Sequence, residues 1–224
     1  IRRQRQMCIR DRDKVEASVG ADFVSNYIWR GTDCGGVSIQ PSMGVSYKGL
    51  SLAAWGSVGI DKEDAREIDL TLGYNTGGFN VSVTDYWFSY HKEDGGYTGD
   101  YFKYGAHSTI HIFEATLGYD FGPLALSWNT YFAGDDYTKE NGDRAYSTYV
   151  GISAPFKLGG LDWSAEVGLT PWEGAYANKF NVTNLTLKAE KEIKFTNSFS
   201  LPTFAQVTFN PHTQGAYFVF GVSF

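Results

Sequence analysis

Apolar and polar side chains alternate with a period of two residues along most of the chain, and this period predicts extended strands rather than helices. Residues 67–74 show the pattern most clearly, since Ile68 and Leu70 share one face while Glu67 and Asp69 share the other. We expect twelve strands, at residues 15–29, 37–47, 50–58, 67–74, 79–90, 107–119, 124–132, 143–156, 161–169, 180–195, 199–209 and 215–224.

The tenth of these segments carries two irregularities. Its alternation slips in phase near Asn184, which predicts a β-bulge. Residues 185–194 also hold Leu, Lys, Ala and Glu, so this part of the segment, taken alone, fits a short helix as an alternative.

The connections between the expected strands alternate in length. The short ones are 48–49, 76–78, 120–122 and 157–159. The longer, acidic or irregular ones are 31–36, 61–65, 91–106, 134–142 and 171–178. Short periplasmic turns and longer outer loops alternate in this way in outer-membrane barrels. A soluble β-sandwich or jelly roll remains the alternative for so many short strands.

Closure of these strands into a barrel satisfies their backbone groups. Strands of about ten residues cross the hydrocarbon layer of a membrane when tilted, and a closed barrel has no unpaired edge. We therefore predict an all-β fold, in which residues 15–224 form a single antiparallel transmembrane β-barrel of about 12 strands. Aromatic residues near strand ends are expected to form an interfacial girdle, namely Tyr27, Trp29, Tyr74, Trp87 and Trp172.

The last strand, residues 215–224, supports this prediction. Ala216, Phe218, Phe220, Val222 and Phe224 share one face of it. The segment resembles the C-terminal strand of Gram-negative outer-membrane β-barrels, which carries outward aromatic residues and closes on Phe.

Composition and charge narrow the classes of function. Aromatic residues make up 17% of the chain, and no run of about 18 apolar residues predicts a membrane-spanning helix. The formal net charge is -6, and residues 1–14 contribute six basic against two acidic side chains, or +4, so residues 15–224 carry -10. An acidic body of this kind argues against nucleic acid as a partner.

Residues 1–14 are expected to lie outside the fold as a basic leader. They lack the apolar core of a secretory signal peptide, so we expect any export signal upstream of them. Residues 6–12 resemble translated sequencing-adapter sequence, and a natural basic tail is the alternative. Cys8 and Cys34 have no metal-type spacing and predict neither a disulfide framework nor a zinc site.

The polar faces of the strands are expected to line a lumen. The lumen-lining candidates are Asp22, Arg30, Glu67, Asp69, Glu114, Asp162, Glu166 and Lys188. Folding the ninth strand onto the tenth is expected to bring Asp162 roughly opposite Lys188 as a cross-strand ion pair. Such charges either line a narrow, cation-preferring pore or fill a plugged lumen with paired groups.

No motif establishes catalysis or a cofactor. His107 and His111 share a face but lie about 13 Å apart on a strand, which makes them poor joint metal ligands. The loop with His91, Glu93, Asp94 and Asp100 suits either a divalent cation or plain solvation, the more ordinary role of an acidic loop. Ser89 with His91 is the only local hint of nucleophilic chemistry. We predict no enzyme, no metal and no cofactor.

The segment 24–31 reads Val-Ser-Asn-Tyr-Ile-Trp-Arg-Gly, and Gln40-Pro41 and an Ala-Trp-Gly-Ser stretch at 54–57 follow it. In this order they resemble the signature of the Gcw-type conserved hypothetical family of Gram-negative bacteria. The resemblance covers mainly residues 19–60. It implies an outer-membrane barrel and supplies no catalytic residues.

These observations predict a barrel in the bacterial outer membrane that lets small polar solutes pass or bind in a polar lumen. The first alternative is a closed accessory or structural barrel whose outer loops bind a partner, through residues 34–37, 91–106 and 134–142. The second is a lipid-modifying enzyme at the outer rim. Membrane lipid is the expected partner, and the pattern leaves the oligomeric state open.

Overall fold

In the computed structural model the chain forms a closed antiparallel β-barrel with a small hairpin folded inside it. The structure describes residues 14–92, 96, 98–196 and 199–224, so most of the basic leader lies outside the described residues. The wall strands are β1 (Glu16–Val24), β4 (Ser38–Tyr47), β5 (Leu50–Gly59), β6 (Arg66–Thr76), β7 (Phe79–Ser89), β8 (Ile112–Asp120), β9 (Ala125–Gly134), β10 (Thr148–Leu158), β11 (Leu161–Thr170), β12 (Asn181–Lys194), β13 (Ser200–Asn210) and β14 (Gly215–Ser223).

Each wall strand pairs with its neighbours in the chain, and β1 pairs with β14 to close the ring, so the prediction of twelve strands is confirmed. The closing seam is short. Its register runs from Asp22 opposite Ser223 to Val24 opposite Gly221, and backbone bonds between Ala21 and Phe224 extend it. No helix long and apolar enough to cross a membrane occurs in the described part of the chain.

The outer face of the wall is apolar. Val19 is 80% exposed and Leu70 is 39% exposed, whereas Glu67 and Glu114, which face inward, are 4% and 1% exposed. A water-soluble barrel would show the reverse distribution, with apolar side chains inside and polar side chains outside. The outer face therefore suits hydrocarbon, and the inner face is polar.

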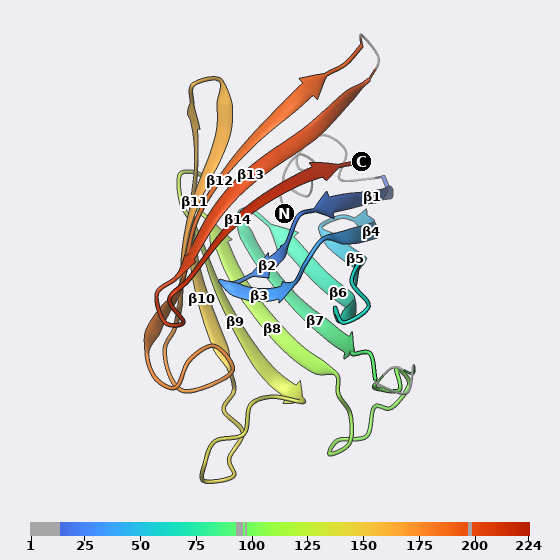
Figure 1. Cartoon of the computed structure of the whole chain (residues 1–224), viewed down its shortest axis with the longest axis vertical. Helices are drawn as coiled ribbons and strands as arrows, with labels where there is room; N and C mark the ends of the chain where they lie inside the picture. Colours follow the sequence, from blue (N-terminus) through green and yellow to red (C-terminus); the bar gives the residue numbers. More distant parts are fainter. Residues whose placement is uncertain (1–13, 93–95, 97, 197–198) are drawn as a thin grey trace.

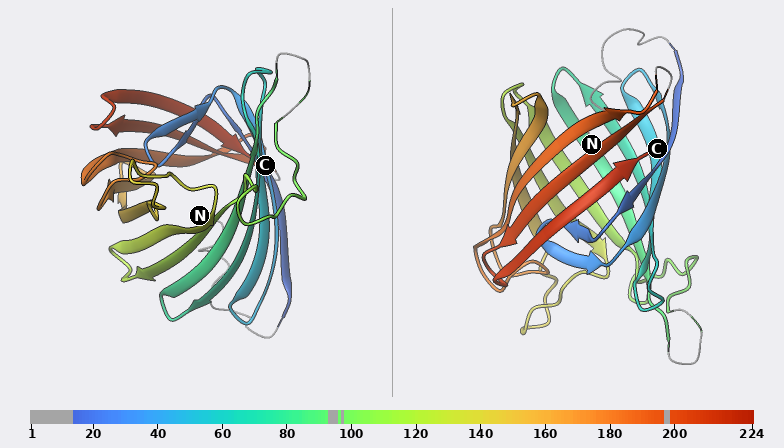
Figure 2. Two further views of the ribbon diagram at one scale, coloured as in Figure 1. Left: turned by 90° about the horizontal axis from the view of Figure 1, so that it is seen from below. Right: turned by 45° about the horizontal axis from the view of Figure 1, so that its top comes forward.

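The long connections gather at one end of the barrel and the short turns at the other (Figure 1). The turn end has connections 48–49, 77–78, 121–124, 159–160 and 195–199, and the loop end has 25–37, 60–65, 90–111, 135–147, 171–180 and 211–214. The predicted alternation is confirmed, although the last loop is short. The strands run obliquely around the wall (Figure 2).

The first predicted strand is wrong beyond Val24. There the chain leaves the wall, and β2 (Tyr27–Trp29) and β3 (Thr32–Gly35) form a separate two-stranded sheet. Tyr27 and Trp29 therefore belong to this hairpin and not to an aromatic girdle, and Cys34 and Gly35 belong to β3 rather than to a partner-binding loop. The wall can dispense with residues 25–37 because Val24 and Ser38 are already register partners.

Two further strands begin later than predicted. β8 starts at Ile112 rather than at residue 107, and β10 starts at Thr148 rather than at residue 143. Local alternation continues into both loops, but the register with the preceding strand stops at Tyr86 opposite Ile112 and at Thr130 opposite Thr148. The predicted bulge is confirmed, since Gly168 lies opposite Asn184 and Leu169 opposite Val182, which leaves Thr183 as the extra residue. The helical alternative for residues 185–194 is wrong, because all of them pair with β13 and residues 185–190 also pair with β11.

The outward position of Leu70 generates the first prediction. In a barrel folded into lipid vesicles, Leu70→Arg should lower the free energy of unfolding by about 2–4 kcal/mol, because an arginine then faces the middle of the bilayer. Leu158→Arg is the matched control, since Leu158 is 64% exposed beside the 159–160 turn and an interfacial arginine costs about 0–1 kcal/mol. Urea titration followed by tryptophan fluorescence measures both losses. Equal losses would contradict this orientation of the wall.

Candidate functional site

The inward hairpin turns at Arg30 and Gly31, which lie between the register partners Trp29 and Thr32. Both residues have positive φ, 51° for Arg30 and 80° for Gly31. Two successive left-handed residues suit the two-residue turn of a tight β-hairpin, whose twist matches that of its strands. This backbone is unfavourable for arginine, so the contacts of its side chain have to hold the turn.

The tip of the hairpin touches β12 and β13, which lie three and two strands from β1 around the barrel. A Cβ added to Gly31 would lie 1.9 Å from the carbonyl oxygen of Thr183, the bulged residue of β12. The side-chain amide of Asn210, at the end of β13, donates a hydrogen bond to the carbonyl oxygen of Gly31 at 3.0 Å. The hairpin therefore leaves the wall between β1 and β4 and contacts β12 and β13 from inside the barrel.

Arg30 and Glu114 form the centre of the site. Arg30 Nη1 lies 2.5 Å from Glu114 Oε2, and Nη2 lies 2.9 Å from Oε1, so the pair is bidentate. The Glu114 side chain is 2% exposed and that of Arg30 is 11% exposed. A buried carboxylate is costly unless it is paired and hydrogen-bonded. The forked geometry is the one that arginine and a carboxylate prefer.

Aromatic rings surround the guanidinium group. Its Cζ lies 4.3 Å from the ring centre of Trp29, 4.8 Å from that of Tyr149 and 5.7 Å from that of Tyr176. Arg30 Nη1 also donates a hydrogen bond of 2.5 Å to the hydroxyl of Tyr176. Stacking on aromatic faces stabilises a desolvated cation by about 2 kcal/mol or more.

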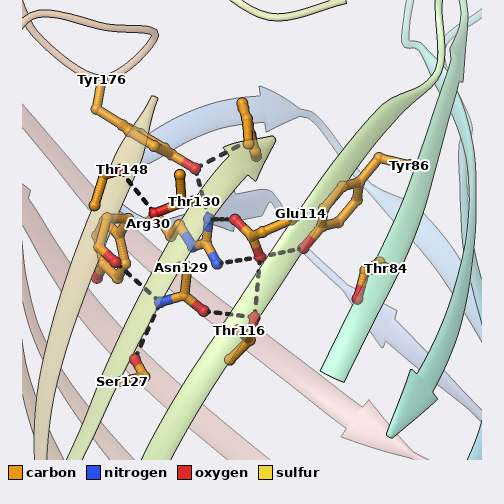
Figure 3. Close-up of polar contacts among 12 residues, drawn as sticks. Arg30, Thr84, Tyr86, Glu114, Thr116, Ser127, Asn129, Thr130, Thr148 and Tyr176 are labelled. Atoms are coloured by element: carbon orange, nitrogen blue, oxygen red, sulfur yellow. Dashed lines mark hydrogen bonds and ion pairs between the residues drawn. The ribbon is translucent and has the colours of Figure 1, made fainter. Parts of the chain in front are cut away.

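A second layer of hydrogen bonds holds these partners in place (Figure 3). Tyr86 donates to Glu114 Oε1 at 2.9 Å, and Tyr176 donates to the hydroxyl of Tyr131 at 3.1 Å. Thr116 donates to Asn129 Oδ1 at 3.0 Å beside the carboxylate. None of these side chains belongs to the hairpin, so the wall and its loops present the site to Arg30.

Burial raises the pKa of Tyr176, a residue of the 171–180 loop, to about 12, although the nearby Arg30 charge opposes the rise. Its phenol is therefore neutral at physiological pH. A neutral phenol can accept the hydrogen bond from Arg30 and donate its own proton to Tyr131 at the same time, as the observed contacts require.

Glu166 joins the cluster from β11. Its Oε1 accepts hydrogen bonds from the Tyr149 hydroxyl at 2.7 Å and from the Asn184 amide at 3.0 Å. Glu166 thus orients the ring that stacks on Arg30. The structure brings three of the predicted lumen candidates together, since Arg30 and Glu114 bind directly and Glu166 acts through Tyr149.

The other acidic candidates lie elsewhere on the inner face. Glu67 and Asp69 follow one another on the inward face of β6, beside the part of the hairpin where Tyr27 packs on Trp55 with ring centres 5.4 Å apart. Asp22 lies on β1 between Gln40 and Ser223. None of these three contacts Arg30 in the described structure.

The predicted pairing of Asp162 with Lys188 is wrong. The register places Asp162 opposite Glu190, whereas Lys188 lies opposite Ser164. Asp162 forms an ion pair of 3.0 Å with Lys157 near the 159–160 turn, and Lys188 forms one of 3.0 Å with Glu190. The prediction missed the true register because β12 is longer than β11 and carries the bulge at Thr183.

Serines and glycines line much of the inner face of β4 to β8. They share the face opposite the exposed Met43 and Leu72, and they are Ser42, Gly44, Ser51, Gly73, Ser82 and Gly118. Ser42 is exposed although it faces inward. On β4 to β8 the turn-side half of the lumen is thus lined by small side chains, whereas the hairpin and its tyrosines lie in the loop-side half. On β12 and β13 the turn-side half also carries Lys188, Glu190 and Phe204.

The other chemical candidates do not form a site. No group of three or more potential metal ligands occurs among the described residues, and Glu93 and Asp94 lie outside them. His111 contacts Asp85 at 2.6 Å, which separates it from any shared site with His107. Ser89 is 2% exposed and donates to the carbonyl oxygen of Thr98 at 2.7 Å, so it does not act as an accessible nucleophile in this structure.

Sequence reasoning missed the tyrosines of the site, which are Tyr86, Tyr131, Tyr149 and Tyr176. Three of them alternate in phase with inward polar residues, for example Tyr131 with Asn129 and Ser127. This shared phase with polar residues was the available sign that the three tyrosines face the lumen. It could not show that these rings converge on Arg30, because Arg30 was placed in the wall.

Neither a protein-family model nor a curated protein matches this chain. Among solved structures it is similar to the crystal structure of BamA from Haemophilus ducreyi lacking POTRA domains 1-3, with a TM-score of 0.40 and 11% sequence identity. The alignment covers 86% of this chain and 41% of that one, so the chain spans less than half of the BamA structure. The assignment of the barrel depends on its own strand pairing and not on this likeness.

The buried ion pair generates the second prediction. Arg30→Met should lower the free energy of unfolding by about 3–5 kcal/mol, because Glu114 then stays buried without its partner. Adding Glu114→Gln should recover part of that loss. Lys157→Met is the matched control at an exposed pair and should cost at most about 1 kcal/mol. Denaturant titration of the refolded variants measures the free energies of unfolding of the Arg30–Glu114 double-mutant cycle. A double variant less stable than either single variant would contradict the prediction.

The contact of Gly31 with the bulge generates the third prediction. Gly31→Ala places a methyl group against the Thr183 carbonyl and adds the strain of a positive φ. Gly142→Ala is the control, since Gly142 has a φ of 86° with nothing within 4 Å of the added Cβ. Gly31→Ala should therefore be the more destabilising change by on the order of 1–3 kcal/mol. Equal thermal stability of the two variants would show that the tip does not press on β12.

Proposed function

We propose that this chain is a Gram-negative outer-membrane β-barrel that lets small polar solutes bind in and pass through its lumen when the inner hairpin moves. Two observations support a location in the outer membrane. Large apolar side chains cover the outside of a closed wall, and that arrangement is suited to lipid. The tilted strands and the division into a turn end and a loop end have the form of such barrels.

The observation that carries the proposal is the hairpin held inside the barrel by Arg30 and Glu114. It lies in the loop-side half of the lumen and leaves a turn-side half that is lined by small residues on β4 to β8 and by charged residues such as Lys188 and Glu190 on β12. Acidic side chains on the inner face outnumber basic ones, which favours cations. The acidic ones include Asp22, Glu67, Asp69, Glu114, Asp162, Glu166 and Glu190, and the basic ones include Arg30, Lys157 and Lys188.

We also propose membership of the Gcw-type family. The motif that carries the resemblance, residues 24–31, coincides with the end of β1 and the first arm and turn of the hairpin. In this proposal the Tyr, aromatic and Arg-Gly positions occur together in the motif because they form the inner hairpin of β2 and β3, which acts as a plug in the lumen. No catalytic role follows for this chain, and we propose a protein that is not an enzyme.

The second candidate function is a closed accessory barrel that binds a partner through its outer loops. Residues 98–111 favour it, because they pack on the outside of the wall. His111 contacts Asp85 Oδ1 at 2.6 Å and the carbonyl oxygen of Tyr101 at 2.7 Å, and Tyr101 stacks edge-on against Trp87 with ring centres 5.4 Å apart. Residues 98–111, held in this way, present a defined outer surface.

Single-channel recording in planar bilayers tests the proposal. Replacing residues 25–37 by Asn-Gly removes the hairpin and joins Val24 to Ser38, which are already paired and suit a two-residue turn. The wild-type protein should show little steady conductance. The variant should show a stable conductance with preference for cations, and Glu166→Gln in that background should reduce the preference.

The control variant replaces residues 139–143 by the same dipeptide. Thr138 and Arg144, which flank this segment, already form a bridge, so an outer loop is shortened without a change to the hairpin. This control should behave as the wild type does. A hairpin-free variant that is folded and inserted but silent would overturn the pore and favour the accessory barrel.

A further inference from the structure

The surroundings of Arg30 have the composition of a binding site for a guanidinium group. The two oxygens of Glu114 accept its forked donors, and the hydroxyl of Tyr176 accepts another hydrogen bond from the same group. The ring of Tyr149 lies over its face at 4.8 Å. A guanidinium group is planar, donates in a fork and stacks on aromatic rings, so each of its recognisable features has a partner here.

These three partners belong to β8, β10 and the 171–180 loop, and none belongs to the hairpin. Only Trp29, among the rings around Arg30, moves with it. The site therefore keeps its carboxylate, its hydroxyl acceptor and one stacking face when the hairpin is withdrawn.

The three partners are also oriented without help from Arg30. Tyr86 donates to Glu114, Tyr131 accepts from Tyr176, and Glu166 accepts from Tyr149. A site held in position by such second contacts does not have to reorganise for a new ligand, and this lowers the free-energy cost of binding.

We propose that this is the solute site of the lumen, that it takes cations bearing a guanidinium group, and that Arg30 occupies it as an internal competitor when the hairpin is in place. The inference depends on the proposed function for its solute, but the site itself can be tested without any conduction. A primary ammonium is a poorer ligand, because it cannot bind both carboxylate oxygens in a planar fork. A neutral urea has the shape without the charge.

The first experiment measures binding to the folded Arg30→Ala protein in detergent, with ethylguanidinium as the probe. Ethylguanidinium should raise the midpoint of thermal unfolding saturably, with a dissociation constant of roughly millimolar order. Ethylammonium should require an at least about tenfold higher concentration for the same shift, as one lost charge-assisted hydrogen bond implies. N-ethylurea should have no effect. If Arg30→Ala folds poorly, the yield of heat-modifiable folded protein on refolding with each probe gives the same comparison.

Two controls identify the site. The wild-type protein should show no such shift, because Arg30 occupies the site already. Arg30→Ala combined with Glu114→Gln should lose the preference for ethylguanidinium over ethylammonium, since the fork then meets a neutral amide. Equal responses to the three probes in Arg30→Ala, or an unchanged response after Glu114→Gln, would overturn the proposal.

The second experiment uses the variant with residues 25–37 replaced by Asn-Gly. Agmatine, a guanidinium-bearing amine, should block its current at a concentration at least about tenfold lower than cadaverine, a diamine of similar length. Equal block would overturn the assignment of the site to the solute. A variant that carries no current but still binds ethylguanidinium preferentially in the thermal-shift experiment would contradict the pore and support the guanidinium site. The two proposals can therefore fail separately.

Discussion

The buried bidentate pair of Arg30 and Glu114 is the interaction on which the interior of this barrel depends. Each charge would be unfavourable alone in the lumen, and each is satisfied only when the hairpin crosses from β1 to the opposite wall. The pair offsets the left-handed backbone of Arg30 and places Gly31 against the bulge of β12. One ion pair therefore sets the position of the hairpin and its contact with the bulge. It also divides the lumen into a loop-side half that holds the hairpin and a turn-side half that does not.

The wall and the plug obey different physical requirements. In the wall, every strand needs backbone partners on both sides, and closure of β1 on β14 meets this need with a short seam. In the plug, the backbone is a two-stranded hairpin, which is marginal by itself, so side-chain contacts with the wall have to stabilise it. A wall held by ladders and a plug held by a few polar contacts can separate without loss of the barrel, and this difference is what the proposed function requires.

The polar cluster is also organised in two layers with separate consequences. The inner layer contacts the guanidinium group, and the outer layer, for example Tyr86, Tyr131 and Glu166, orients the inner one from the wall. These outer contacts also satisfy the remaining lone pairs of the buried carboxylate. The outer layer keeps the partners of Arg30 in place irrespective of Arg30, and for this reason the cluster fits a ligand site as well as a plug.

Alternation along the chain determined most of the barrel, because neighbours in a meander pair in order and a period of two assigns each side chain to the lipid or the lumen. The strand number, the turn end and the bulge at Thr183 follow from such local patterns. The hairpin does not, since Tyr27 and Trp29 fall in phase with Ala21 and Phe23 of β1, and only the pairing of Val24 with Ser38 shows that the wall has already turned. The partner of Arg30 lies 84 residues away on β8, and its tyrosines come from strands and a loop whose convergence depends on the curvature of the closed wall. Contacts across the lumen join residues that no local period relates, so the tertiary structure alone decided them.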